Sequence, residues 1–442
     1  MFSTMKNAWA IPDLRKKILF TLFIIVVFRF GAVITVPFLN VEALQGLMGQ
    51  VGESGNALGY LDMLSGGAFA NATLFAMSVT PYINSSIILQ LLTVALPPLE
   101  RLAKEGEEGR KKIAAITRYV TVVLGLIQGT AYYFYLHNSS YEGIPITMFN
   151  SGWEQAFSAV VIIFTFTAGT ALMMWMGEQV NKYGIGNGIS ILLFSGIVAR
   201  MPHIMNTLGK YLQIANQDPS TYGKYYAFVP IFVVLFLAVI WFIVLMNNSE
   251  RRIPIQYAKR MVGRKMYGGQ SSHIPIKIAM SGVMPIIFAS SILAIPSTIQ
   301  LFTNPKSGFW KGFLDAFSST GWMYSLVYFL LIVMFAYFYV TIQYNPIEMA
   351  NNLRQSNGTI PGVRPGKPTS DFISRILSKL TLIGALFLAV VALLPIIFGA
   401  ATGMHNMSLG GTSLIILVGV ALDTVKQMES QMMMRHYKGF LD

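Results

Sequence analysis

The sequence predicts an all-α polytopic membrane protein with ten transmembrane helices arranged in two inverted halves of five. Three observations support this fold class: the composition, ten long apolar runs, and an uneven distribution of basic residues. The 442 residues are 54% hydrophobic and only 12% charged, whereas a soluble domain carries about twice that share of charge. The chain contains no cysteine, which excludes disulfides, thiolate metal sites and cysteine nucleophiles.

Each apolar run is close to the roughly 20 residues that a helix needs to cross a bilayer. The fifth run is short and interrupted by glycines. The predicted spans cover residues 18–37, 73–96, 115–136, 156–176, 187–204, 227–246, 276–301, 323–343, 380–399 and 409–428.

The basic residues predict the orientation. With the N-terminus inside, 26 of the 32 Lys and Arg residues fall in inner segments and 5 in outer loops. By the positive-inside rule, both termini are expected in the cytoplasm. The remaining basic residue, Arg29, lies within the first span, where a charge is expensive. We expect it either to reach outward to the surface or to bond backbone carbonyls between helices, and we favour a structural role.

An odd number of spans per half means that two similar halves, residues 1–226 and 227–442, have opposite orientations, with the working site near mid-membrane between them. The sequence PYINSSIIL at 81–89 also resembles PIIFASSIL at 285–293, offset by one residue. An internal repeat explains this echo; chance similarity between two apolar, serine-containing helices is the alternative. Ile83 and Ile287 would both lie near mid-membrane.

The second span has unusual polar content. Residues 74–96 are uncharged, yet Asn84, Gln90 and other polar side chains form a flank that should face other helices or water rather than lipid. The preceding stretch, residues 61–72, contains a Gly66-Gly67 break and is too short to span, so we expect protein to shelter it within the membrane region.

Apolar residues recur four positions apart, as in the pairs Val79 with Ile83 and Ile189 with Leu193. An apolar ring of this kind can seal a pore against ions. Ordinary helix packing is the alternative explanation.

Two inner loops, at about residues 247–275 and 344–379, are long enough to form binding surfaces. In the first, alternation of Ile253, Ile255 and Tyr257 with polar residues predicts a hairpin. Its basic charge fits an acidic partner, RNA phosphate or anionic lipid, although positive-inside bias alone is the alternative. In the second, a turn at residues 361–366 presents Arg364, which we expect to be a contact residue.

The residue inventory argues against several functions. No Asp or Glu lies in the middle of a predicted span, and ion-coupled transporters usually need one, although backbone carbonyls can bind Na⁺ instead. No metalloprotease, phosphate-loop or nucleophile-elbow motif is present. We therefore expect no enzymatic activity, no cofactor and no metal, and any energy must come from a partner or from the membrane potential.

Several motifs in order resemble the SecY/Sec-alpha translocon family of protein-conducting channels, over about residues 12–440. They include MLSGGA at 63–68, PYI at 81–83, WMGEQ at 175–179, GIGNGIS at 184–190, YAKR at 257–260, PGVRPG at 361–366 and GGTS at 410–413. The resemblance implies a central pore through which unfolded secretory polypeptides cross the bacterial plasma membrane, with lateral release of apolar segments into lipid.

The resemblance also implies the site residues. A pore ring would comprise Val79, Ile83, Ile189, Leu193, Ile287 and Ile416. A plug, at about residues 59–70, would include Gly59, Tyr60, Leu61, Asp62, Met63, Leu64, Ser65, Gly66, Gly67 and Ala68. A lateral gate would use Asn84, Gln90, Gln128, Ser290 and Ser291. Docking would use Arg251, Arg252, Lys259, Arg260, Arg264, Lys265 and Arg364.

The implied partners are the small membrane subunits SecE and SecG, the SecA motor ATPase, the ribosome, the preprotein with its signal sequence, and anionic lipids. One departure is Ala279, early in the seventh span, where family members often carry Asn. We expect a weaker polar latch across the gate and easier opening. The alternative function is an inverted-repeat secondary transporter for a small solute, which would run without a motor and leave the basic loops passive; an intramembrane enzyme is poorly supported.

Overall fold

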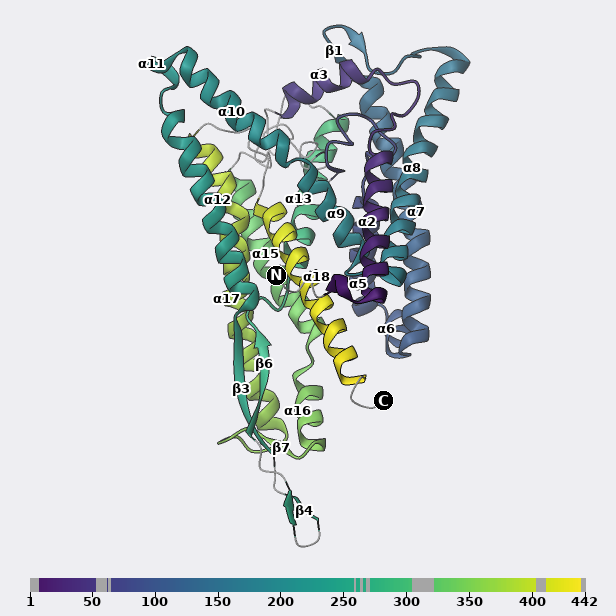
Figure 1. The fold of residues 1–442 in the computed structure, drawn as a ribbon. Helices are drawn as coiled ribbons and strands as arrows, with labels where there is room; N and C mark the ends of the chain where they lie inside the picture. Colours follow the sequence, from purple (N-terminus) through teal and green to yellow (C-terminus); the bar gives the residue numbers. More distant parts are fainter. Residues whose placement is uncertain are drawn as a thin grey trace.

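Each of the ten predicted spans overlaps a helix of a computed structural model (Figure 1), which describes residues 8–52, 62, 65–257, 260–262, 265–267, 271–303, 322–402 and 411–438. These helices are α2 (Pro12–Gly31), α5 (Thr80–Ala95), α7 (Glu107–Asn138), α8 (Gly152–Tyr183), α9 (Gly188–Ala199), α12 (Tyr225–Asn248), α13 (Met284–Thr303), α15 (Trp322–Gln343), α17 (Lys367–Thr402) and α18 (Gly411–Lys438).

These ten helices differ in whether they are long and apolar enough to cross a membrane. Within the described ranges, six helical stretches are long and apolar enough to cross a membrane, and a seventh qualifies if α5 and the following α6 (Pro97–Lys104), bent by 100°, form one span. The stretch that contains α9 continues into α10 (Met201–Gln217). The predicted fifth span therefore covers α9 and the first residues of α10, which meet at Arg200.

The second and seventh spans begin later than predicted. The polypeptide at residues 73–79 forms turns, and the chain from the end of β6 to residue 283 also forms a turn. An uncharged apolar sequence does not reveal such a break. In both places a residue with positive φ, Ser78 (51°) or Gly282 (57°), lies two positions before the helix. Pro81 and Pro285 then occupy the second helical position, where the missing N–H of proline costs nothing.

Smaller elements close the two ends of the bundle (Figure 1). At one end lie α10 and four short elements: α3 (Val41–Gly52), β1 (Ser140–Tyr141), β2 (Ile144–Pro145) and α11 (Pro219–Tyr222). At the opposite end lie β3 (Glu250–Tyr257), β4 (Arg260–Val262), β5 (Lys265–Tyr267), β6 (Ser271–Lys277), α16 (Pro346–Gln355) and β7 (Gly358–Thr359).

The predicted hairpin is confirmed. β3 pairs with β6 in antiparallel register, with Ile253 opposite Ile274, and β7 adds a third strand in the order β6-β3-β7. Ile253 and Ile255 are each only 2% exposed. They pack in an apolar core with Leu353 of α16 and with residues at the start of α17. The long basic loops therefore form one folded unit, which we call the hairpin module.

The helix α17 belongs to two apolar cores. Near its start, Ile373 and Leu377 pack in the core of the hairpin module. Farther along, Phe387 and Leu388 pack with residues of α13 and α15 in a core of the bundle. One helix of 36 residues therefore connects the module to the bundle.

Candidate channel constriction

The predicted ring residues lie on α5, α9, α13 and α18 and immediately before α5. Ile189 and Leu193 are one turn apart on α9, and Ile416 lies on α18, which packs against α9. Val79 immediately precedes α5. These four side chains are at most 9% exposed and share one apolar cluster, against which Ile83 packs.

The sixth predicted member of the ring lies to one side. Ile287 of α13 packs in the neighbouring apolar cluster, to which Ile83 also contributes. Ile83 therefore links the two clusters. The structure brings five of the six predicted residues into one cluster and places the sixth beside it.

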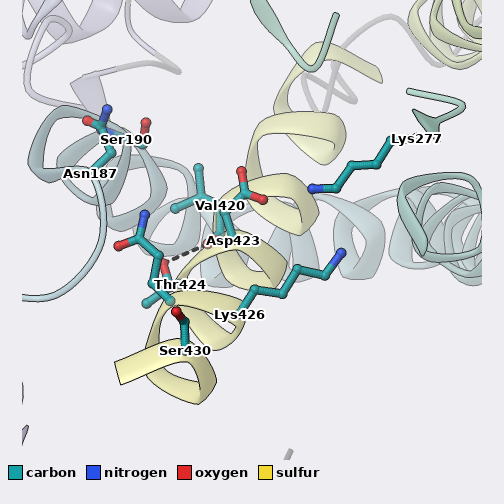
Figure 2. Close-up of a pocket in the computed structure, with 9 residues that line it drawn as sticks. Asn187, Ser190, Lys277, Val420, Asp423, Thr424, Lys426 and Ser430 are labelled. Atoms are coloured by element: carbon teal, nitrogen blue, oxygen red, sulfur yellow. Dashed lines mark hydrogen bonds between the residues drawn. The ribbon is translucent and has the colours of Figure 1, made fainter. Parts of the chain in front are cut away.

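A polar cavity of about 450 Å³ adjoins this apolar cluster (Figure 2). Its walls continue the helices that carry the cluster: Ser190 follows Ile189 on α9, and Val420 lies one turn after Ile416 on α18. The lining residues are Asn187, Ser190, Lys277, Val420, Asp423, Thr424, Lys426, Gln427 and Ser430. The polar cavity and the apolar cluster are therefore adjacent along α9 and α18.

The charges of this cavity are mixed. Lys277, the last residue of β6, points towards the carboxylate of Asp423, and Lys426 lies one turn further along α18 (Figure 2). This group of charges was not predicted from the sequence. A signal was available in the polar residues that continue the helix face of Ile416, but β6 and α18 are far apart in sequence.

The predicted plug is described at Asp62 and from Ser65 onward; Gly59, Tyr60, Leu61, Met63 and Leu64 lie outside the described residues. The described part is folded on itself. The hydroxyl of Ser65 donates to the Asp62 carbonyl (2.9 Å), and the Phe69 N–H donates to that hydroxyl (3.0 Å). The Phe69 ring stacks on Tyr132 of α7 at 4.3 Å. Ser65 and Ala68 are at most 1% exposed.

Arg29 has the structural role that was predicted. Its guanidinium donates to the backbone carbonyl of Ser195 on α9. The same guanidinium lies near Gly66, at 3.1 Å from the position that a Cβ would take. Arg29 therefore joins α2, the end of α9 and the plug segment.

The predicted gate residues are distributed over α5, α7 and α13. Asn84 is partly buried and Gln90 exposed on α5, while Gln128 of α7 is partly buried. On α13, Ser290 is 8% exposed and donates to the Ile287 carbonyl, and Ser291 is partly buried.

Residues on the two sides of the predicted gate belong to one apolar cluster. Ile83 and Ile87 of α5 share an apolar cluster with Ile286 of α13. On its own side, α5 is tied to α7 by the buried hydroxyls of Ser85 and Thr121, 2.6 Å apart. Ala279 differs from expectation, because it lies in the turn before α13, 9% exposed, rather than within the helix.

The predicted docking residues are mostly on the hairpin module. Arg251 and Arg252 are exposed on β3, and Arg252 pairs with Glu250 at 2.7 Å. Arg364 is exposed between Gly362 (φ 79°) and Gly366 (φ 100°), which form the predicted turns. Arg260 and Lys265 lie on the short strands β4 and β5. Lys259 and Arg264 are outside the described residues.

Comparisons with known proteins agree on one family. A sequence model of the SecY family matches residues 73–425. The protein translocase subunit SecY of Streptomyces coelicolor is 42% identical over 447 residues, with 100% of both chains covered. A solved SecY structure, whose plug domain is described as stabilising the closed state of the translocation channel, gives a TM-score of 0.64 at 17% identity, covering 94% of this chain and 92% of that one.

A eukaryotic channel shares the same fold. Sec61 in the canine ribosome–channel complex gives a TM-score of 0.59 at 15% identity, covering 94% of this chain and 92% of that one.

Proposed function

Because the chain belongs to the SecY family, we propose that it is the pore subunit of a preprotein translocase, a passive channel that conducts unfolded secretory polypeptides. The observation that carries this proposal is the arrangement of three features along α9. A polar cavity is lined by Asn187 and Ser190 at its start, Ile189 and Leu193 belong to the apolar cluster, and the predicted plug segment lies against its last turn. A pore for a solute would instead need a shaped polar pocket at its centre.

The constriction suits a substrate of variable side chains. Val79, Ile189, Leu193 and Ile416 offer no polar partner to a hydrated ion, so the closed ring resists ion flow. Aliphatic side chains can part around a polypeptide without selecting a sequence. The ring is therefore a seal, and selection belongs to the partners.

The gate between α5 and α13 suits release into lipid. Its described residues are apolar, such as Ile83 and Ile87, or carry uncharged hydroxyls and amides, such as Asn84, Gln90 and Ser290. Opening this seam exposes no charge to the bilayer. Apolar segments of the substrate can leave by this route.

The two-halves arrangement, residues 1–226 and 227–442, is supported by matched helix starts. In α5 and α13 the proline at the second position follows a positive-φ residue by three positions, at Ser78 and Gly282. A similar local geometry in spans two and seven favours an internal repeat over chance similarity.

The partners of the channel follow from its surfaces. The exposed residues Arg251, Arg252 and Arg364 of the hairpin module form a basic docking surface for the SecA motor or the ribosome, and the Sec61 relative is seen in a ribosome complex. SecE and SecG would clamp the helices, and anionic lipid would contact the basic end. The chain is an integral membrane protein; we place it in the bacterial plasma membrane with both termini and the hairpin module in the cytoplasm, as the basic residues indicate.

A site-specific crosslink tests the pore. The chain has no cysteine, so Ile83→Cys provides a single thiol at the ring, and a secretory precursor with one cysteine is stalled during transport. We expect a disulfide that depends on the precursor's targeting signal. Val234→Cys is the matched control, because Val234 is 67% exposed on the outside of α12. Equal crosslinking of both variants, or none at Ile83 with the precursor engaged, would refute the pore assignment.

A further inference from the structure

One ion pair differs from the others in the described chain because both of its members are largely buried. Arg200 and Asp62 approach to 2.7 Å, and their side chains are only 16% and 9% exposed. The next most buried pair, Arg118 with Glu178, is 52% and 29% exposed. Burying two charges is costly, so such a pair is weak evidence for stability and often has another role, such as fixing one of two arrangements.

The two partners belong to segments that are far apart in the chain. Asp62 opens the described part of the plug segment, where its other carboxylate oxygen accepts the Ala70 N–H at 2.7 Å. Its backbone carbonyl accepts the Gly67 N–H at 2.9 Å. Asp62 therefore both organises the fold of this segment and makes one of its contacts with the rest of the molecule.

Arg200 lies at the junction of α9 and α10, as the residue that follows α9 and precedes α10. One turn earlier on α9, the Gly196 carbonyl lies 2.8 Å from the position of a Cβ on Gly66. The end of α9 thus contacts the plug segment at two points. The backbone of Gly196 lies close to Gly66, and the side chain of Arg200 pairs with Asp62. The same helix carries Ile189 and Leu193 of the ring.

We propose that the Asp62–Arg200 ion pair is a polar latch that positions the plug segment against α9 when the channel is closed. This inference rests on the proposed function and goes beyond it, because it assigns a positioning role to Arg200. When the channel opens, the plug segment leaves α9 and both charges become hydrated.

A charged latch has a property that an apolar contact lacks. Water solvates a separated carboxylate and guanidinium well, so breaking this contact exposes no apolar surface of its own. Inside the closed channel the same charges must be paired. The latch therefore holds the segment in one position while allowing it to be freed.

The test reads the position of the plug segment directly. Ala68→Cys, at a residue 1% exposed, supplies the only thiol, and a membrane-impermeant maleimide is added from the outer side of spheroplasts carrying the full channel complex. Asp62→Asn and Arg200→Gln should each raise the labelling rate about tenfold or more, which corresponds to ~1.4 kcal/mol or more. Arg200→Lys, which keeps the charge, should stay close to the parent.

The double variant separates a pair from two independent effects. Asp62→Asn with Arg200→Gln removes both charges, so its labelling rate should fall well short of the product of the two single effects. The matched control is Arg118→Gln, which breaks the pair between α7 and α8 and should leave labelling unchanged.

The outcomes distinguish the latch from the channel function. Unchanged labelling in both single variants, or an equal rise in Arg118→Gln, overturns the latch. If the Ile83→Cys crosslink forms while labelling is unchanged, only the latch fails. If labelling rises but no crosslink forms, the ion pair stands as the anchor of this segment and the proposed function fails.

Discussion

Arg29 and Asp62 are two charged residues whose side chains are held by partners from distant segments of the chain. Arg29 lies in an apolar run, so it needed a backbone partner or the surface, and it binds the Ser195 carbonyl. The partner of Asp62 was not predictable, because Arg200 is distant in sequence and reads as an ordinary loop cation. Lys277 and Asp423 were missed for the same reason. Composition shows which residue needs a partner, but the tertiary fold decides which partner it finds.

Two adjacent glycines provide a prediction at this scale. Gly66 and Gly67 both have positive φ, 69° and 90°, so alanine is strained at either position by about 1–3 kcal/mol. A Cβ at Gly66 would also meet the Gly196 carbonyl at 2.8 Å, whereas no described residue other than the two chain neighbours lies within 4 Å of a Cβ at Gly67.

Gly66→Ala should therefore move the plug segment off α9, and Gly67→Ala should do so less. Maleimide labelling of Ala68→Cys in each background measures this. Faster labelling in Gly67→Ala than in Gly66→Ala would contradict the close contact with α9.

At the scale of elements, periodicity predicted the hairpin and the long helices but not where every helix starts. Alternation of Ile253 and Ile255 gave the buried face of β3 correctly. The predicted start of α5 was several residues too early. Residues 73–79 are apolar enough for a membrane helix, but the backbone at Ser78 forms a turn. A long apolar run predicts that a segment is buried, but it does not show whether the buried segment is helical.

The hairpin module should respond to its own core. Ile255→Ala removes a side chain that is 2% exposed, at a cost of about 2–5 kcal/mol. We expect proteases to cleave the β3–β6 hairpin while the membrane helices stay protected. Gln256→Ala, at the exposed neighbouring position, is the control. Cleavage that spreads through the bundle would show that the module has no separate stability.

At the scale of the whole molecule, charge bias and the number of apolar runs predicted the helical bundle, and each run overlaps a helix. The ring was predicted through family resemblance, and five of its residues share a cluster. The polar cavity required the three-dimensional arrangement, because α9, α18 and β6 meet only after folding.

The docking surface gives a prediction at this scale. Arg364→Glu reverses an exposed charge at the end of the hairpin module, so motor-driven translocation should fall at least about tenfold while the amount of channel in the membrane stays constant. Lys210→Glu reverses an exposed charge on α10, at the opposite end, and should have little effect. Translocation by reconstituted vesicles measures both variants. Equal rates in the two would contradict docking at Arg364.

The sharing of α17 between two cores has a mechanical consequence. At 1.5 Å per residue, its 36 residues form a rod of about 54 Å. Near its start, Ile373 and Leu377 pack in the core of the hairpin module. Farther along, Phe387 and Leu388 pack in the core that includes α13. Close packing transmits displacement rather than absorbing it. Under the proposed function, a partner that pushes on the hairpin module would displace α17 against α13, the proposed gate helix, so force would reach the proposed gate without passing through the substrate.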